Sequence, residues 1–496
     1  MTRETVVRRL VVCVLLSVLS QASPVGAESL CWESLTPSTE MGDEVAGPEL
    51  TVAARGGQLW RAWVHSGTGL HVQQRKAGNW RDVPVPGPKE KIRDPLLRIS
   101  GDGSVFLSWA DIAESSSAIF VARWTGDRWQ RLGAPLSGMP GPCTNAGYAD
   151  VAPDAPGGPI VAWQERENND PVALYVARWD GNTWTSLPSP MNARSDLYAL
   201  EPALVVDGNQ NIWLAWNDGD THRSFVRVSR WTGAAWEDVG GTASGSLRHS
   251  EEVRAPRLDV LPDGHATVVW GEWSNERGGV YVADWDGNHW KPGPPPLRVS
   301  NSTPSDAVVA RGQDGALYLA RSEADSSDID SVYIQRRTRS GWEWVVRGAQ
   351  FDTGQSDTDD PRMAIDNDLY LAWPEPSGDS GLVGHVVRFS HCLAGQKPAG
   401  FSKSRPRASF WPKTVRAAVD DQLKRLSEKD KADLRARTRS DLIRFHHGWG
   451  TGIRNEYGLW RGNAALLKDC GNVHPDDCSM KIIEEVWKQL VKSPAR

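Results

Sequence analysis

A carboxylic acid recurs through most of this chain, each time two residues after a repeated landmark residue. The acids are Asp111, Glu165, Asp218, Glu272, Glu323 and Glu375, and His65 takes the same place in the first repeat. Acids repeated in this way either accept hydrogen bonds from backbone N–H groups at turns or form a ring that faces a ligand or a cation. A pair of them about 5–10 Å apart would also suit hydrolysis of a polysaccharide. The spacing alone leaves these interpretations open.

The landmark residue is a tryptophan in every repeat but one. It stands at Trp63, Trp109, Trp163, Trp216, Trp270 and Trp373, and Arg321 stands in the sixth place. A second series consists of Trp80, Trp129, Trp184, Trp236, Trp290 and Trp342. Both series repeat every ~50 residues, which is typical of propeller arrays. Most of the 25 tryptophans are therefore expected to pack between repeats rather than to form a platform for sugars. Arg321 is a candidate binding residue because it departs from the pattern.

Residues 202–240 show what one repeat is expected to form. They contain four short runs rich in β-branched and aromatic residues, separated by Gly, Asn and Asp. Such runs predict strands, and such separators predict tight turns. Four short antiparallel strands in about 40–50 residues make one blade of a β-propeller.

The repeats indicate seven blades. Seven second strands can be aligned but only six complete outer hairpins, because the last hairpin, which ends near residue 392, lacks its outer strand. Residues 31–37 match the outer strand at 183–188, so the N-terminal segment is expected to close the last blade and to leave no open strand edge. The predicted fold is an all-β seven-bladed β-propeller of four-stranded antiparallel blades over residues 28–392, followed by a small all-α domain.

The repeat also resembles a known group. Its unit, an apolar strand, then V-x-A-W-x-E/D, then V-Y-V-A-R-W-D-G-N-x-W-x-x-L, looks like the tryptophan-rich propeller repeats of many exported bacterial proteins, most closely at residues 175–187 and 281–290. The resemblance implies the fold and no single activity, since the group includes lectins, adhesins and proteins of unknown role. The Asp-box of sialidases, S-x-D-x-G-x-x-W, is not reproduced in this sequence.

Residues 1–27 have the features of a secretory signal peptide. Three arginines precede an apolar run at residues 10–19, and small residues follow before the expected cleavage position. The run is shorter than the roughly 20 residues of a membrane span, so we expect a secreted or periplasmic protein without a membrane span after cleavage. A membrane anchor and a lipoprotein are the alternatives. Leu30 before Cys31 counts against lipidation, which favours a small residue there.

Export would place the cysteines where disulfides form. One of the six cysteines lies in the signal segment. Cys31 and Cys392 fall at neighbouring positions of the closing hairpin, so we predict that they pair across the seam of the ring. Cys470 and Cys478 are predicted to be a second pair. Cys143 lies in a long loop between blades and is expected to be unpaired.

The composition changes after the propeller. Residues 393–410 combine Gly, Ser and Pro with four basic residues, as in a flexible linker. In residues 411–496, apolar positions recur at helical spacing from Val415 to Leu426, and a last amphipathic helix is expected to begin near Pro475. Residues 411–414, a Gly-rich motif at 444–463 and residues 474–477 resemble a small bacterial domain family of unknown function. The resemblance implies a compact α domain with no established chemistry.

The Gly-rich motif supplies a second set of candidate binding residues. They are His446, His447, Arg454, Glu456 and Arg461. Adjacent histidines point about 100° apart on a helix and lack the H-E-x-x-H spacing of zinc sites, so no metal or cofactor is expected. The arginines and the glutamate could form a structural network, bind an anion or take part in catalysis.

Charge divides the chain. Residues 393–496 hold 21 Lys and Arg against 12 Asp and Glu, a net charge of +9; residues 1–27 carry +2, so the −6 of the whole chain leaves −17 for residues 28–392. An exported acidic chain is not expected to bind nucleic acid. The basic domain is expected to dock on the acidic propeller, or each domain to recruit a partner of opposite sign; the alternative is that both surfaces are simply solvated.

Two classes of function remain. The first is an exported binding or scaffold protein that recognises a protein or a glycan with one face of the propeller. The inter-blade loops at 136–148, 189–200 and 242–255 share a face with the repeated acids by the usual blade order, and loops on a rigid scaffold are frequent binding sites. The alternative is a hydrolase or lyase that acts on a polysaccharide. The sequence identifies no catalytic residue, which favours the first class.

Overall fold

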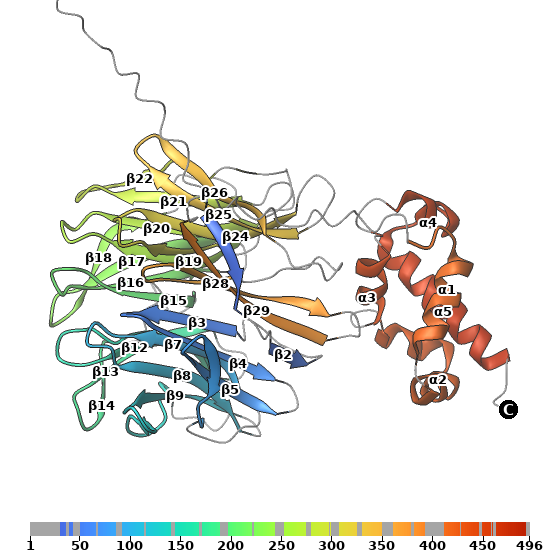
Figure 1. Ribbon diagram of the computed structural model, residues 1–496, viewed down its shortest axis with the longest axis horizontal. Coiled ribbons are helices and arrows are strands. Elements are labelled where there is room, and N and C mark those ends of the chain that lie inside the picture. The colour runs from blue at the N-terminus through green and yellow to red at the C-terminus, as the bar shows by residue number, and fades with distance from the viewer. Residues whose placement is uncertain are drawn as a thin grey trace, which may run out of the picture.

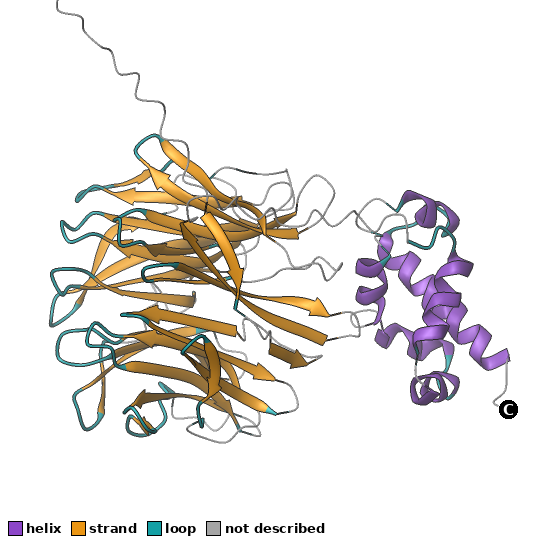
Figure 2. Ribbon diagram, viewed as in Figure 1, coloured by secondary structure: helices purple, strands orange, loops and turns teal. Residues whose placement is uncertain are grey.

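The structure is a computed structural model of the 496-residue chain. The residues that it describes are 30–35, 39–42, 50–65, 68–85, 92–113, 116–139, 144–167, 171–188, 197–220, 223–243, 252–273, 279–296, 298, 307–324, 330–349, 361–377, 381–391, 411–426, 428–445, 449–457, 459 and 463–492. Strands occupy the first part of the chain and helices the last (Figure 2). No described helix is long and apolar enough to cross a membrane.

The described strands pair antiparallel within seven blades, which confirms the predicted fold, and blades 2 and 3 also meet at one parallel pairing, Asn145 opposite Ser117. Figure 1 shows the blades from the side. Blade 1 contains β3 (Leu50–Arg55), β4 (Gln58–His65), β5 (Gly69–Lys76) and β6 (Asn79–Asp82); blade 2 contains β7 (Ile92–Ile99), β8 (Val105–Ile112), β9 (Ser117–Trp124) and β10 (Trp129–Arg131); blade 3 contains β11 (Thr144–Ala152), β12 (Ile160–Glu167), β13 (Ala173–Trp179) and β14 (Trp184–Ser186). Blade 4 contains β15 (Tyr198–Val206), β16 (Ile212–Gly219), β17 (Ser224–Trp231) and β18 (Trp236–Thr242); blade 5 contains β19 (Glu252–Val260), β20 (Ala266–Trp273), β21 (Gly279–Trp285) and β22 (Trp290–Pro292); blade 6 contains β23 (Val308–Arg311), β24 (Leu317–Ala324), β25 (Asp330–Thr338) and β26 (Gly341–Ala349).

Blade 7 is assembled from both ends of the propeller sequence. Its strands are β27 (Arg362–Ile365), β28 (Leu369–Ser377), β29 (Gly381–His391) and the N-terminal β1 (Leu30–Ser34), and β2 (Thr39–Gly42) also pairs with β29. β1 runs antiparallel to β29 with Trp32 opposite Phe389. The predicted closure by the N-terminal strand is therefore confirmed.

The first strands of the blades form a closed circle. Each first strand lies beside the first strand of the next blade, and β27 of blade 7 lies beside β3 of blade 1. The apolar core lies between neighbouring blades. Trp60 of blade 1, for example, is fully buried and meets Trp124 and Trp129 of blade 2 edge-on, with ring centroids 5.7 and 6.0 Å apart. Wedge-shaped packing of this kind is what the tryptophan series predicted.

In blades 1, 3, 5 and 6 the tryptophan near the start of the outer strand also fastens its blade to the one before it. Trp184 Nε1 donates to the backbone oxygen of Leu132 at 2.6 Å, and Trp290 Nε1 donates to that of Val239 at 2.6 Å. Trp80 Nε1 of blade 1 donates in the same way to Leu35, the residue after β1, at 2.9 Å. The same bond therefore links neighbouring blades and crosses the closure seam.

The first strands of blades 2 to 5 share an irregularity that the sequence did not predict. Each has a β-bulge, and the residue there has a positive φ: Asp94, Tyr148, Glu201 and Ala255. The Asp94 carboxylate accepts from Tyr148 N at 3.1 Å, and the Glu201 carboxylate accepts from Ala255 N at 2.6 Å. These bonds satisfy N–H groups that the bulges leave unpaired in the sheet and link blade 2 to 3 and blade 4 to 5.

The C-terminal part is a helical domain with its own core. Its helices are α1 (Val415–Arg425), α2 (Glu428–Arg435), the 3-10 helix η2 (Arg439–Phe445), α3 (Trp449–Glu456), α4 (Ala464–Asp469) and α5 (Pro475–Lys492). α1, α2, α3 and η2 all contact α5, whose Ile482, Ile483 and Val486 are fully buried. Helix α5 begins at Pro475, as predicted, because proline suits the first position of a helix.

Candidate functional site

The repeated acids lie on the same face of their strands as the landmark tryptophans, because side chains two residues apart in a strand point to the same side. Trp163 Nε1 donates to Glu165 Oε2 at 2.8 Å, and Trp270 Nε1 donates to Glu272 Oε1 at 2.7 Å. Glu165 is fully buried and Glu272 is 5% exposed. In these two blades the acid satisfies an indole N–H group inside the protein.

Two further contacts show what the acids do. Glu165 also fixes the loop from blade 2 to blade 3, because it accepts from Ser137 Oγ at 2.6 Å and from Gly138 N at 2.7 Å. Asp218, which is 1% exposed, forms an ion pair with Arg227 Nε at 2.5 Å. The acids are thus acceptors within the molecule, as one of the two interpretations held. Their donors are mainly side chains, however, rather than turn amides.

Blade 6 replaces the tryptophan–acid pair by an ion pair. Arg321 Nη2 and Nε lie 2.7 and 3.1 Å from Glu323 Oε2, and both residues are 1% exposed. The guanidinium also lies over the ring of Trp344, 5.9 Å from its centroid. Burial lowers the pKa of Arg321, and the carboxylate of Glu323 opposes that change. The structure therefore brings these two candidate residues together, but inside the blade.

The other candidate residues of the propeller have separate settings. The ring of His65, at the end of β4, meets that of His71 edge-on at 72°, with centroids 6.3 Å apart. Asp111 is half-buried, and burial raises the pKa of its carboxyl group. Glu375 lies in β28, but its side chain is outside the described residues. These three residues belong to three different blades, so the structure does not bring them together in one site.

Replacing Glu272 by Gln is expected to make stability less dependent on pH. Burial raises the pKa of Glu272 to about 7, whereas an unfolded glutamate titrates near ~4.3. Between these values the folded protein binds more protons than the unfolded chain, so the free energy of unfolding falls as pH rises. Glu272→Gln keeps an acceptor for Trp270 but does not titrate. Between about pH 5 and about pH 8 its free energy of unfolding should therefore rise by ~1–3 kcal/mol relative to that of the wild type. Urea denaturation at both pH values measures this; equal pH slopes would contradict it.

Arg454 is the one candidate residue of the helical motif whose side chain is described. Its Nη1 donates to Ser479 Oγ at 2.9 Å and its Nε lies 3.0 Å from Asp476 Oδ1, both near the start of α5. Gly450 leaves room for this guanidinium, since a Cβ there would lie 3.2 Å from Nη1. Through these two contacts Arg454 joins α3 to α5. Because its side chain is only 5% exposed, we interpret it as part of a structural network. His446, His447, Arg461 and the side chain of Glu456 lie outside the described residues.

A second buried network joins α1 to α3. The Tyr457 hydroxyl accepts from Gln422 Nε2 and donates to Asp421 Oδ2, both at 2.8 Å. Gln422 Oε1 in turn accepts from Trp449 Nε1 at 2.6 Å. Such satisfied networks fix how helices pack, so the polar residues of this motif have a structural explanation.

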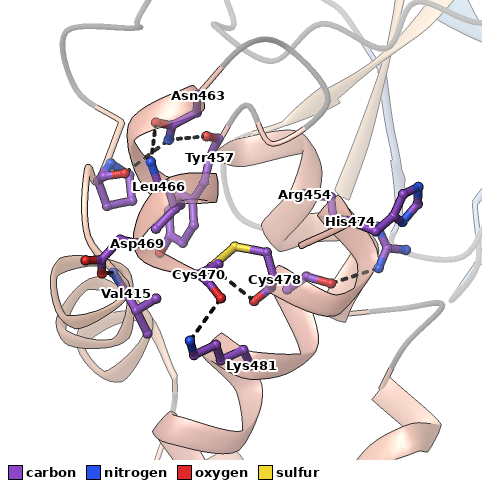
Figure 3. Close-up of a disulfide and its surroundings, with 12 residues drawn as sticks. Val415, Arg454, Tyr457, Asn463, Leu466, Asp469, Cys470, His474, Cys478 and Lys481 are labelled. Atoms are coloured by element: carbon purple, nitrogen blue, oxygen red, sulfur yellow. Dashed lines mark hydrogen bonds between the residues drawn. A yellow bond between two sulfur atoms is a disulfide. The ribbon is translucent and has the colours of Figure 1, made fainter. Parts of the chain in front are cut away.

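A disulfide joins Cys470 to Cys478, as predicted (Figure 3). It links the end of α4 to the first turn of α5, with the two Cα atoms 5.4 Å apart. Lys481 Nζ donates to the Cys470 backbone oxygen at 3.0 Å beside it. Cys31 lies opposite Ser390 in the closing pair of strands, but Cys392 and Cys143 are outside the described residues. The predictions for those two cysteines stay predictions.

Replacing both Cys470 and Cys478 by Ala is expected to lower the stability of the helical domain by about 2–3 kcal/mol, because the bond closes a short loop and so restricts the unfolded chain. Reduction of the wild-type protein should act in the same direction. The loss of helical circular dichroism on heating, with and without reductant, measures the effect. Cys143→Ala is the matched control, since this residue is predicted to be unpaired. Equal midpoints for the oxidised and reduced wild type would contradict the expectation.

Within the described ranges, no three His, Cys, Asp or Glu side chains are grouped so that they could hold a metal ion.

Two open grooves lie on the face of the propeller that carries the tight hairpin turns, opposite the face of the repeated acids. Groove 1, between blades 1 and 2, has a volume of about 590 Å³, and groove 2, between blades 2 and 3, has about 320 Å³. Both volumes fall in the range of ligand sites. The residues that line groove 1 include Gln58, Gln74, Lys76, Trp124 and Gln130; those that line groove 2 include Phe106, Pro153, Asp154, Pro159 and Trp179; Asp102, Ser104 and Arg123 line both.

None of these groove residues was among the predicted site residues. The residues that depart from the repeat, Arg321 and His65, belong to the series on the opposite face. A groove is formed by side chains of two neighbouring blades, and a pattern within one repeat does not predict it. One signal was present: the pair Arg123-Trp124 at the end of a third strand recurs as Arg178-Trp179 in the next blade. Arg123 is exposed, and Trp124, Arg178 and Trp179 are half-buried beside their hairpin turns, so the repeated Arg-Trp pair is the sequence signal for a binding element at this face.

Comparisons with known proteins concern the two parts of the chain separately. Residues 411–490 match the model of a domain of unknown function, DUF6794, in line with the resemblance noted from the sequence. No curated protein matches the chain.

Solved structures similar to the propeller include enzymes and a protein of unknown function. An ulvan lyase of polysaccharide lyase family PL25, bound to -[GlcA(1-4)Rha3S]-, has a TM-score of 0.48 at 11% identity over 70% of this chain and 95% of its own. A sialidase of Trypanosoma rangeli has 0.42 at 12% identity over 70% and 60%. A protein of unknown function from Dyadobacter fermentans has 0.41 at 12% over 73% and 97%. Such distant likenesses carry no argument about activity, and the fold rests on the strand pairing itself.

Proposed function

We propose that this protein is an exported binding protein that recognises a glycan with the hairpin-turn face of its propeller. The observation that carries this proposal is groove 1. Its lining combines three glutamines with Lys76, Arg123 and the half-buried ring of Trp124. Amide and charged side chains donate and accept hydrogen bonds, as sugar hydroxyl groups require, and an indole ring offers an apolar surface to the C–H groups of a sugar.

A protein partner is the less favoured ligand. Peptides are usually recognised through an exposed strand edge or an apolar groove with pockets for side chains. Because the ring of blades is closed, each first strand lies beside the first strand of the next blade and offers no open edge to a peptide. The lining of groove 1 is largely polar. The chemistry of the groove therefore fits hydroxyl groups better than apolar side chains.

The rival function, a hydrolase or lyase acting on a polysaccharide, has less support. Such an enzyme would need two carboxyl groups that reach the substrate. Four of the six repeated acids, Glu165, Asp218, Glu272 and Glu323, are at most 5% exposed. These four side chains are engaged with donors inside the protein and cannot contact a polymer without local unfolding.

A binding assay combined with an activity screen tests the proposal. The mature protein would be applied to an array of plant, algal and bacterial polysaccharides, and each bound polymer would be checked for released reducing ends and for unsaturated products. We expect retention on at least one polymer without turnover. Turnover of the bound polymer would favour the rival, and retention on no polymer would overturn the proposal. Replacing His65, at the end of β4 on the acid-bearing face, by Ala should leave binding unchanged; loss of binding would instead favour recognition on that face.

A further inference from the structure

The two grooves are the two sides of one ridge. The ridge is the turn at residues 100–104, between β7 and β8, together with Arg123 beside it. Asp102, Ser104 and Arg123 line both grooves, and Arg123 Nη2 donates to Ser104 Oγ at 2.8 Å. A ligand in one groove would therefore contact the same three side chains as a ligand in the other.

Neighbouring blades hold this ridge from both sides. Gln58 Nε2 of blade 1 donates to the Gly103 oxygen at 2.8 Å. On the other side, Gly101 N donates to Asp154 Oδ1 of blade 3 at 2.8 Å. The ridge therefore has a fixed position before any ligand arrives, and such preorganisation reduces the entropy lost on binding.

The top of the ridge presents one negative and one positive group. The Ser100 hydroxyl and the Ser104 N–H group bind the Asp102 carboxylate and lower its pKa to about 2, so the carboxylate is ionised at any physiological pH. Arg123 lies beside it, with side chains 49% and 68% exposed for Arg123 and Asp102. Together they offer donors and acceptors with no net charge, which suits an uncharged polymer with many hydroxyl groups.

The grooves repeat one aromatic feature at the spacing of the blades. Trp124 lines groove 1 and Trp179 lines groove 2. Both residues end the third strand of their blade and pair with the tryptophan that opens the fourth strand. Equivalent surfaces on either side of a polar ridge are suited to a ligand that itself repeats.

We propose that groove 1, the ridge and groove 2 form one elongated site for an uncharged glycan chain that crosses blades 1 to 3. This inference rests on the proposed function and adds the length and charge of the ligand. Arg123 and Asp102 bind hydroxyl groups at the centre of the site, and the two grooves bind the sugars on either side.

The test measures how affinity depends on chain length and on Arg123. Neutral polymers, namely β-1,3-glucan, β-1,4-glucan, xylan, arabinan and galactan, are first screened for retention. Calorimetric titration then uses the oligosaccharide series of the retained polymer, from disaccharide to hexasaccharide. We expect the wild type to bind the hexasaccharide at least about tenfold more tightly than the disaccharide, and Arg123→Ala to lose about tenfold in hexasaccharide affinity, as for one hydrogen bond from a charged group.

A matched control is available in blade 4. Arg230 precedes Trp231 as Arg123 precedes Trp124, and the exposed fractions of the two arginine side chains, 45% and 49%, are similar. Arg230→Ala should leave hexasaccharide affinity unchanged. Equal affinities for the disaccharide and the hexasaccharide, or an equal loss in both arginine variants, would overturn the two-groove site while binding itself, and so the proposed function, would stand. Retention of the wild type on a charged polymer and on no neutral one would overturn the uncharged ligand, whereas retention on no polymer of the wider array would overturn the proposed function.

Discussion

Removing residues 30–35 is expected to open the propeller and to lower its stability by several kcal/mol. β1 pairs with β29 along its whole length, and the following Leu35 is 2% exposed. Leu35 N donates to Val386 O of blade 7 at 2.8 Å, while Leu35 O accepts from Trp80 of blade 1 at 2.9 Å. The strand therefore joins blade 7 to blade 1. Loss of one buried leucine alone typically costs about 2–5 kcal/mol.

The deletion should also change how the protein behaves in solution. It uncovers the outer edge of β29 at residues 387–391, while β2 still pairs with residues 382–384, and such uncovered edges recruit other chains. We expect a lower unfolding temperature together with concentration-dependent association, measured by thermal scans and by size-exclusion chromatography. The chain that begins at residue 28 is the control, and Leu35→Ala should reproduce part of the thermal loss without exposing the edge. A deletion variant that stays monomeric with an unchanged unfolding temperature would contradict the role of β1.

Glu323→Gln is expected to destabilise the propeller by about 3–5 kcal/mol, because it leaves the buried guanidinium of Arg321 without its counter-charge. Both residues are 1% exposed, so water cannot replace the lost carboxylate without opening the blade. Arg298 Nε also lies 4.0 Å from Glu323 Oε1. Without the negative charge of Glu323, the positive charges of Arg298 and Arg321 would repel each other. Denaturant titration of wild type and variant at one pH measures the difference.

The control for this experiment is Arg321→Trp with Glu323 retained. It gives blade 6 the tryptophan–acid pair that blade 3 and blade 5 have at the same place, where an indole N–H donates to the acid at 2.8 and 2.7 Å. The indole N–H would then be the donor to Glu323, as it is to the acids of blades 3 and 5, and Arg298 stays 4.0 Å from the carboxylate, so we expect a smaller loss than for Glu323→Gln, about 1–2 kcal/mol. If Arg321→Trp were as destabilising as Glu323→Gln, the loss would reflect packing of this site and not the unpaired charge.

The architecture was predictable because each blade repeats the same packing. The tryptophans of the second strands mark the same buried position in successive wedges, so their spacing gave the number of blades. The match of residues 31–37 to an outer strand gave the closure, and the structure places Trp32 opposite Phe389 as that match required. The boundary of the last helix at Pro475 followed from local propensity.

The bulges and the grooves were not predictable in the same way. A bulge at Asp94 or Glu201 is stabilised by an N–H group of the next blade, and a groove is formed by residues of two blades that are far apart in sequence. Both depend on how wedges meet, which a repeat pattern does not describe. The contact between the acids and the tryptophans could have been predicted from the sequence, because side chains two residues apart in a strand, such as Trp163 and Glu165, point to the same face. The repeat pattern predicts backbone donors or ligands for these acids, whereas in blades 3 and 5 the donor is the indole two residues earlier.

The closure of the ring sets a condition on the order of folding. Glu33 of β1 and Arg388 of β29 form an ion pair although 355 residues separate them in sequence. Contacts between such distant residues form late, because the chain between them must be arranged first. During synthesis β1 is made before any blade, yet its partner is the last strand of the propeller. Only a chain that contains all seven blades pairs both of its outermost strand edges, so ring closure distinguishes a fully folded propeller from a truncated one.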